Sequence, residues 1–204
     1  MKDNLNIDLN ILKNNFLKHK GTFHIEDNIK IKFASEIMIP LLNEISPLDS
    51  IKFQSEYNYL KGGRADATYK NIVFEYKKGE YFNTQKGINE ALFGRDEKDH
   101  GLESYLISHS DIDQSDLEDI KIKKIIGNIG IGFDGNQFIF SRYVKNNNIN
   151  KKLNVSKTKY KGQELILPIE FKYEILDMNR GLERLVLILR QRKKMALTKE
   201  NLLT

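Results

Sequence analysis

Residues 62–78 read GGRADATYKNIVFEYKK and form the most informative stretch of the sequence. Two strand-like runs, residues 64–69 and 72–76, flank a polar break at Lys70 and Asn71. Short runs rich in β-branched and aromatic residues on either side of a two-residue break are typical of a β-hairpin. We therefore expect two antiparallel strands joined by a tight turn.

The hairpin register brings two carboxylates together. If residues 70–71 form the turn, Tyr69 pairs with Ile72 and Asp66 lies directly opposite Glu75. Facing side chains have their Cβ atoms about 4.5–5.5 Å apart, so the two carboxylates should repel each other and weaken the sheet. A divalent cation between them would reverse the sign of that interaction. Mg²⁺ suits such a site, because it binds one or two carboxylates and keeps several waters.

Lys77 adds a cation to the same face of the second strand, because strand side chains alternate and Lys77 follows Glu75 by two positions. An ammonium at this place can orient a metal-bound water and balance charge on a phosphate. The competing interpretation is an exposed Glu-Lys ion pair of structural origin. The apolar run IVF before Glu75 argues against it, because a glutamate in such a strand is expensive to bury.

The run Gly63-Arg64-Ala65-Asp66, followed by IVFEYK, resembles the PD-(D/E)XK nuclease superfamily. Ala65 stands where the family name has proline. More narrowly, the stretch resembles the N-terminal nuclease domains of restriction-modification enzymes that join cleavage to an adenine methyltransferase. The later hairpin, NIGIGFDGNQFIFSRY, also resembles strands of these domains.

The resemblance implies a restriction-endonuclease-like core and a set of catalytic residues. It implies Asp66 and Glu75 as ligands of Mg²⁺ or Mn²⁺ and Lys77 as the catalytic lysine. Glu36 matches an extra acidic residue that many such nucleases carry on their first helix; the alternative is a surface helix charge. Gln85 matches a helix glutamine of some branches, although the tyrosine that usually follows it is not at its usual place.

The rest of the chain predicts an α/β (α+β) fold, with a mixed central sheet of about four or more strands flanked by helices. A helix is expected over 27–45, where Pro40 should disturb or restart it, followed by a strand over 51–57 and helices over 84–94 and 99–109. Strands are expected over 129–133 and 137–143, on either side of Asp134-Gly135, and one or two more within 165–175. A C-terminal helix is expected over 179–194. We expect a nuclease domain over residues 1–178. Residues 179–204 should form a helix and a linker toward a downstream region.

Composition narrows the class of protein. The chain contains no cysteine, which excludes disulfides and thiolate metal sites. Its longest apolar run near the end, LVLIL, is too short to span a membrane, so we expect a cytoplasmic protein without a membrane partner. The formal net charge of +5 leans toward polyanions.

Basic residues are concentrated between Arg142 and Lys161, where seven occur without an acid. Such a segment can lie along a DNA backbone, or it can be a solvated face. The residues expected to contact DNA are Arg64, Lys151, Lys152, Lys157 and Lys159.

These patterns together predict a Mg²⁺-dependent endonuclease that hydrolyses double-stranded DNA, as part of a restriction-modification enzyme. A methyltransferase or helicase region in the same polypeptide and a homodimer are the expected partners. Two alternatives stay open: a non-catalytic DNA-binding or scaffold domain with the same fold, and a DNA-repair nuclease.

Overall fold

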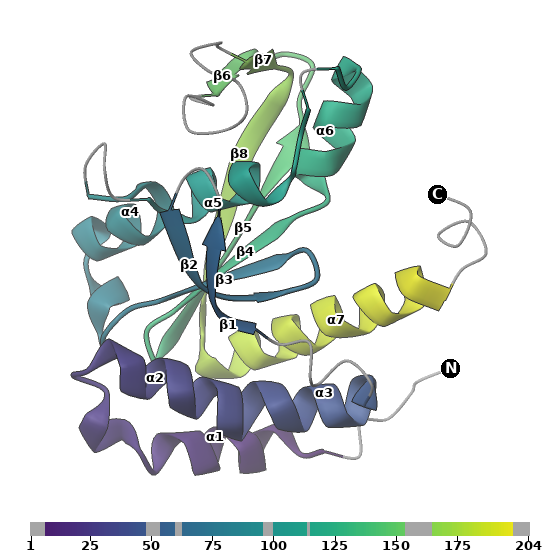
Figure 1. Cartoon of the computed structure of the whole chain (residues 1–204). Helices are drawn as coiled ribbons and strands as arrows, with labels where there is room; N and C mark the ends of the chain where they lie inside the picture. The colour runs from purple at the N-terminus through teal and green to yellow at the C-terminus, as the bar shows by residue number, and fades with distance from the viewer. Residues whose placement is uncertain are drawn as a thin grey trace.

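The computed structural model describes residues 7–47, 54–59, 63–95, 100–113, 115–153 and 165–197 (Figure 1). The helical elements are α1 (Leu9–Leu17), η1 (Lys20–Thr22), α2 (Glu26–Phe33), η2 (Ala34–Met38), α3 (Ile39–Ile45), η4 (Tyr81–Asn83), α4 (Gln85–Phe93), α5 (Leu102–His109), α6 (Glu118–Ile126) and α7 (Met178–Leu197). The strands are β1 (Gln54–Tyr59), β2 (Gly63–Tyr69), β3 (Ile72–Tyr76), β4 (Ile129–Phe133), β5 (Gln137–Lys145), β6 (Lys151–Leu153), β7 (Leu165–Leu167) and β8 (Ile169–Asp177).

A six-stranded sheet runs through the molecule in the order β1-β2-β3-β4-β5-β8. The pair β3–β4 is parallel, and the other four neighbouring pairs are antiparallel. The sheet is flanked by helices and followed by α7, so the predicted mixed α/β class with a C-terminal helix is confirmed. Strands β6 and β7 form a separate two-stranded sheet.

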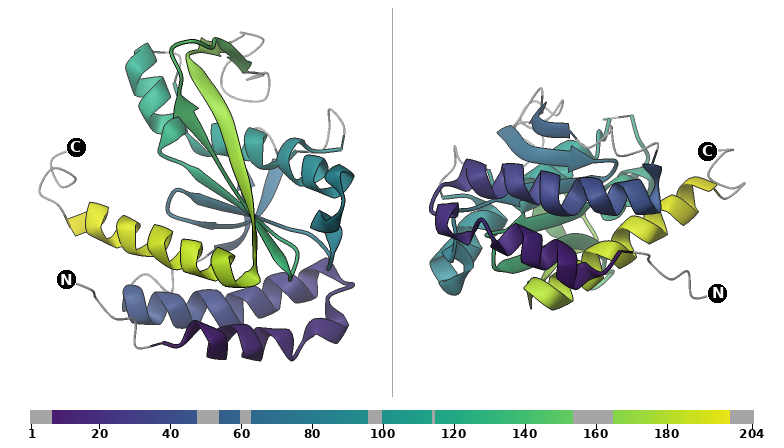
Figure 2. Two further views of the ribbon diagram at one scale, coloured as in Figure 1. Left: turned by 180° about the vertical axis from the view of Figure 1, so that it is seen from behind. Right: turned by 90° about the horizontal axis from the view of Figure 1, so that it is seen from below.

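Helices cover both faces of the sheet (Figures 1 and 2). Helices α1, α2, α3 and α7 lie on one face, and α4, α5 and α6 lie on the other. The first face holds an aromatic core in which Phe33 contacts Phe74, Tyr76 and Phe133. The second face is packed mainly with aliphatic side chains, among them Val73, Leu106 and Ile125, together with Tyr143. Strand β3 lies between the two cores, and its five residues are all buried.

The predicted helix over 27–45 exists as one rod made of α2, η2 and α3. A π-turn over Ala34–Met38 precedes Pro40, which occupies the first turn of α3. Proline is tolerated there because its missing N–H would have no partner inside the new helix. Pro40 therefore restarts the helix, as expected, without ending the rod.

Helix α1 was not predicted. The Asp8 carboxylate accepts a hydrogen bond of 2.8 Å from the Asn10 N–H and caps the helix. Leu12 and Phe16 are buried on its inner face. The spacing of these two residues and the Asp8 cap are the sequence features from which this helix could have been predicted.

No helix within the described ranges is both long enough and apolar enough to cross a membrane.

Helix α7 crosses the first core at close range through Gly181. A Cβ atom at this position would overlap the ring of Phe138, which is fully buried and has its ring centroid 4.3 Å from that of Phe133. The ring has no room to withdraw. Glycine is therefore required here by packing rather than by backbone conformation.

We expect Gly181→Ala to destabilise the fold by about 1–3 kcal/mol, because overpacking a rigid core outweighs the better helix propensity of alanine. Urea unfolding would measure the loss. Gly21→Ala is the matched control, since nothing lies within 4 Å of a Cβ there, and its effect should stay within about 0.5 kcal/mol. Equal effects of the two substitutions would contradict the packing argument.

Candidate active site

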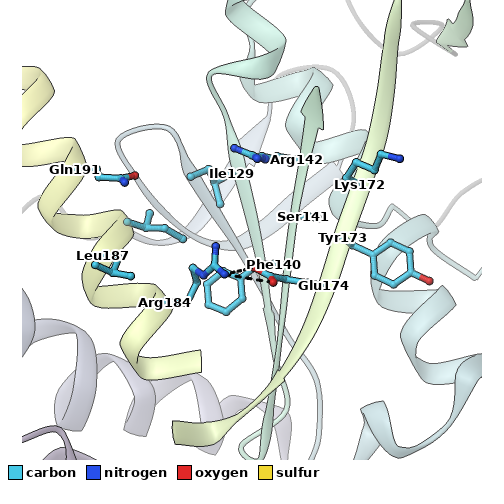
Figure 3. Close-up of a pocket in the computed structure, with 11 residues that line it drawn as sticks. Ile129, Phe140, Ser141, Arg142, Lys172, Tyr173, Glu174, Arg184, Leu187 and Gln191 are labelled. Carbon is cyan, nitrogen blue, oxygen red and sulfur yellow. Dashed lines mark hydrogen bonds and ion pairs between the residues drawn. The ribbon is translucent and has the colours of Figure 1, made fainter. Parts of the chain in front are cut away.

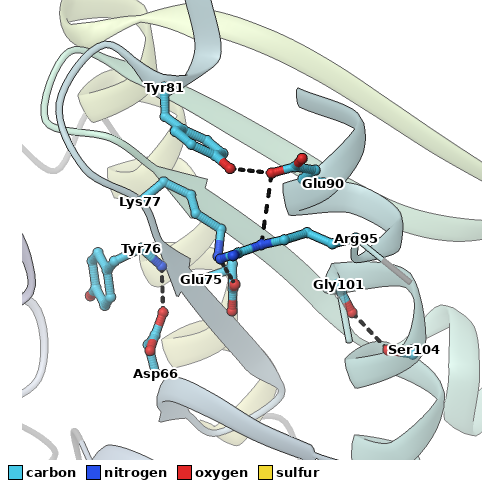
Figure 4. Close-up of polar contacts among 9 residues, drawn as sticks. All are labelled: Asp66, Glu75, Tyr76, Lys77, Tyr81, Glu90, Arg95, Gly101 and Ser104. Atoms are coloured by element: carbon cyan, nitrogen blue, oxygen red, sulfur yellow. Dashed lines mark hydrogen bonds and ion pairs between the residues drawn. The ribbon is translucent and has the colours of Figure 1, made fainter. Parts of the chain in front are cut away.

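The predicted hairpin register is confirmed up to the point where the strands separate. Tyr69 pairs with Ile72, and the ladder continues to Ala67 and Phe74. Asp66 and Glu75 are the next facing positions, but the ladder stops before them. The Asp66 carboxylate instead accepts a hydrogen bond of 2.7 Å from the Tyr76 N–H (Figure 4). Asp66 thus lies at the mouth of the gap between β2 and β3.

Glu75 and Lys77 share a face of the β3 segment, as predicted. The Lys77 Nζ atom lies 2.6 Å from the Glu75 Oε1 atom. The two residues are only 5% and 8% exposed, so the ion pair is held in a largely dry environment. The Lys77 N–H donates to the Phe133 carbonyl at 3.0 Å, which extends the pairing of β3 with β4 through the site. The interpretation as an exposed surface pair is wrong.

Burial is the main cause of the electrostatics at Glu75. Desolvation raises the pKa of Glu75 to about 8; Lys77 opposes this shift, and the nearby Asp66 adds to it. Burial alone would lower the pKa of Lys77, but the negative charges of Glu75, Glu26 and Asp66 together outweigh it, with Glu75 contributing most, and the net direction is upward. Lys77 therefore keeps its proton at neutral pH.

Glu26 is a third carboxylate of the cluster, and the sequence analysis missed it. It is the first residue of α2, and its negative charge contributes to the raised pKa values of both Glu75 and Lys77. Burial raises the pKa of Glu26, with Lys77 opposing. The position is fixed by Gly79, whose N–H donates to the Phe23 carbonyl at 2.7 Å just before the helix. An acid at the helix start, ahead of the buried Ile29, was the available signal.

Neither Glu36 nor Gln85 is brought to this cluster. Glu36 lies ten residues after Glu26 on the same rod, about 15 Å farther along its axis, and its Oε1 atom is 3.9 Å from His19 Nε2. Gln85 is exposed at the start of α4, where its side-chain amide donates to Asn89 at 2.9 Å. Helix geometry therefore selects Glu26 in place of Glu36.

The loop after Lys77 is held in place by Asp134. The fully buried Asp134 carboxylate accepts hydrogen bonds from the N–H groups of Phe82 and Gln137, at 2.9 and 2.8 Å, and holds η4 against the β4–β5 turn. This confirms the predicted hairpin turn and gives its aspartate a structural role.

From this loop, the Tyr81 hydroxyl donates to the Glu90 carboxylate, and Arg95 Nε lies 3.8 Å from the same carboxylate (Figure 4). The positive charge of Arg95 opposes the upward pKa shifts of Glu26 and Tyr81. The exposed guanidinium of Arg95 therefore lies beside the cluster.

Two of the residues predicted to contact DNA, Lys151 and Lys152, lie far from the cluster. Phe138 pairs with Phe133, so it lies at the same end of the sheet as Glu75. From there β5 runs to Lys145 at the opposite end of the sheet, about 24 Å away. Lys151 follows at that opposite end, where its ammonium pairs with Glu103 of α5, while Lys152 is exposed. Lys157, Lys159 and the side chain of Arg64 lie outside the described residues.

The cluster can supply some of the ligands of a small divalent cation. Among the described residues, no three His, Asp or Glu side chains converge tightly enough to surround an ion. Asp66 and Glu75 nevertheless supply carboxylate oxygens from two facing strands. Mg²⁺ requires no more from the protein, because it keeps several waters and takes the rest of its ligands from a phosphate. The residues present fit such an ion.

Compared with known proteins, the chain matches no protein-family model, no curated protein and no solved structure. The resemblance carried by residues 63–77 therefore remains a prediction, and the functional argument depends on the geometry of the site.

The raised pKa of Glu75 gives the metal-free protein a specific pH dependence. Between about pH 5 and pH 8 the folded protein keeps a proton on Glu75 that the unfolded chain has lost. Stability should therefore fall as pH rises through this window, by up to about 1.4 kcal/mol per pH unit. Urea unfolding at several pH values in chelator would measure the slope. The slope should become shallower in Glu75→Gln, where Glu26, whose pKa burial also raises, still contributes; an unchanged slope would contradict the assignment.

Proposed function

We propose that this chain is a Mg²⁺- or Mn²⁺-dependent endonuclease domain that hydrolyses phosphodiester bonds of double-stranded DNA. The observation that carries the proposal is the charge imbalance around Lys77. Three carboxylates, from Asp66, Glu75 and Glu26, act on one buried ammonium. A structural ion pair would need one carboxylate, and the two additional ones weaken the metal-free fold.

The residues divide the chemistry of hydrolysis between them. A divalent ion held by Asp66 and Glu75 would supply a water of lowered pKa and polarise the phosphate. Lys77 keeps its proton, so it acts as a hydrogen-bond donor and a positive charge rather than as a general base. It can orient the attacking water and balance the charge that develops on the phosphate. Glu26 can accept a hydrogen bond from that water.

The surrounding surface supports a polyanionic substrate. Arg95 stands beside the cluster as a bidentate-capable phosphate contact, and Arg is the side chain best suited to that geometry. Lys151 and Lys152, which lie near the far end of β5, can contact backbone phosphates about one strand length, or about 24 Å, from the cluster. We further propose that the domain acts on foreign DNA in the cytoplasm, within a restriction-modification enzyme.

Plasmid and linear duplex DNA provide the direct test. Cleavage should require Mg²⁺ or Mn²⁺ and stop in chelator. Glu75→Gln and Lys77→Met should each reduce the rate at least about 10²–10³-fold, because each removes a preorganised electrostatic group. Circular dichroism should show that both variants stay folded. A wild-type protein that binds DNA without cutting it would instead support a scaffold function.

Glu26 and Glu36 form a matched pair of helix carboxylates for a second test. Glu26→Gln should lower the cleavage rate about 10–100-fold, as expected for a group that acts through the water around an ion. Glu36→Gln, on the same rod, should leave the rate unchanged. A larger loss in Glu36→Gln than in Glu26→Gln would show that the helix is placed differently.

A further inference from the structure

Strand β8 is an edge strand of the main sheet. It pairs with β5 over nine consecutive positions, from Ile169 opposite Lys145 to Asp177 opposite Gln137. It is the last strand in the sheet order, and no other strand of the described part of the chain pairs with its outer side (Figure 2). Alternate residues of β8 therefore present backbone N–H and C=O groups to the outside.

Three of the devices that commonly block edge pairing are missing from β8, although it does carry charged side chains, which are a fourth. Natural edge strands are usually short, bulged or interrupted by proline. Strand β8 is nine residues long, keeps an unbroken register with β5 and contains no proline. Tyr173 and Ile175 are 45% and 38% exposed on one face. Figure 3 shows Tyr173 projecting from the face opposite to that of Glu174, which pairs with Arg184 of α7 at 3.3 Å.

The side chains of β8 are complementary to a second, antiparallel copy of the same strand. Tyr173 is the midpoint of the strand and would face Tyr173 of the second copy. Lys172 would then face Glu174, and Phe171 would face Ile175, each pairing occurring twice by symmetry. Opposite charges and apolar pairs that face each other across strands are stabilising.

The charge pattern also selects this register over its neighbours. In a two-fold antiparallel pair, residues that face each other must lie on the same side of the joined sheet. One residue of the strand therefore faces its own copy at the two-fold axis, and a different register places a different residue there. Centring on Lys172 would place Lys172 against itself and Glu170 against Glu174. Centring on Glu174 would place that carboxylate against its own copy. Like charges directly opposite are unfavourable, so Tyr173 is the favoured centre.

We propose that two copies of this chain associate through β8, antiparallel and centred on Tyr173, and so join their sheets into one continuous sheet. The two-fold interface is self-complementary, as such interfaces must be. The two β3 strands would lie seven strand spacings apart, about 34 Å along the sheet. The pairing concerns the edge strand alone and stands whether or not the Glu75 cluster cleaves DNA.

Disulfide trapping tests the register, because the chain has no cysteine. In Tyr173→Cys the two thiols would face each other with Cα atoms about 4.5–5.5 Å apart, within the range a disulfide spans. In Ile175→Cys, the control of similar exposure on the same face, they would lie about 14 Å apart. Mild oxidation should crosslink Tyr173→Cys at least tenfold faster. Equal rates, or no crosslinking of either variant, would overturn the proposal.

Charge reversal gives an independent readout of association. Lys172→Glu and Glu174→Lys should each be monomeric in analytical ultracentrifugation at concentrations where the wild type dimerises, because each brings like charges together. Mixing the two folded variants should restore a heterodimer in which both charge pairs are opposite again. Two variants that dimerise as the wild type does, or a mixture that stays monomeric, would contradict the proposed pairing. Thermal unfolding of each variant would show that the monomer itself is intact.

Discussion

The burial of Glu75 and Lys77 at the end of an apolar strand is the constraint on which the rest of the structure depends. A carboxylate and an ammonium 2.6 Å apart satisfy each other in part, but Asp66 and Glu26 add negative charge that the single ammonium cannot offset. Removing charges from water is costly, and an unbalanced buried cluster is costlier. Burial and this excess of negative charge raise the pKa of Glu75, and a divalent cation would offset the charge and leave the carboxylates ionised.

Each neighbouring element of the fold maintains this arrangement. The separation of β2 from β3 gives Asp66 a position beside the gap, where it accepts from the Tyr76 N–H. The close approach of Gly79 to Phe23 sets the start of α2, and with it Glu26. Asp134, fully buried, holds the loop after Lys77 to the next hairpin. The two cores on either side of β3 keep the strand fixed, so the charged groups cannot relax away from one another.

The short-range features of the site could be predicted from the sequence, and the long-range ones could not. Strand alternation and the two-residue turn predicted the hairpin register and the shared face of Glu75 and Lys77, because both depend on neighbours within a few residues. Alternation and turn residues likewise predicted the hairpin at Asp134-Gly135. The choice between Glu26 and Glu36 depends on where a helix crosses the sheet, and the pairing of Lys151 with Glu103 depends on a contact across 48 residues. The acid at the helix start marked Glu26 as a candidate, but no local pattern shows where the helix crosses the sheet, so Glu36 was favoured and Glu26 missed.

The central claim, that the cluster is a divalent cation site, is tested most directly by calorimetric titration of Mn²⁺ in two buffers of different ionisation enthalpy. Such a titration reports both binding and proton release. We expect a single Mn²⁺ site whose occupation releases protons below about pH 8, because the ion would displace the proton of Glu75, and whose affinity collapses in Glu75→Gln. Absence of binding, or equal binding by wild type and Glu75→Gln, would contradict it.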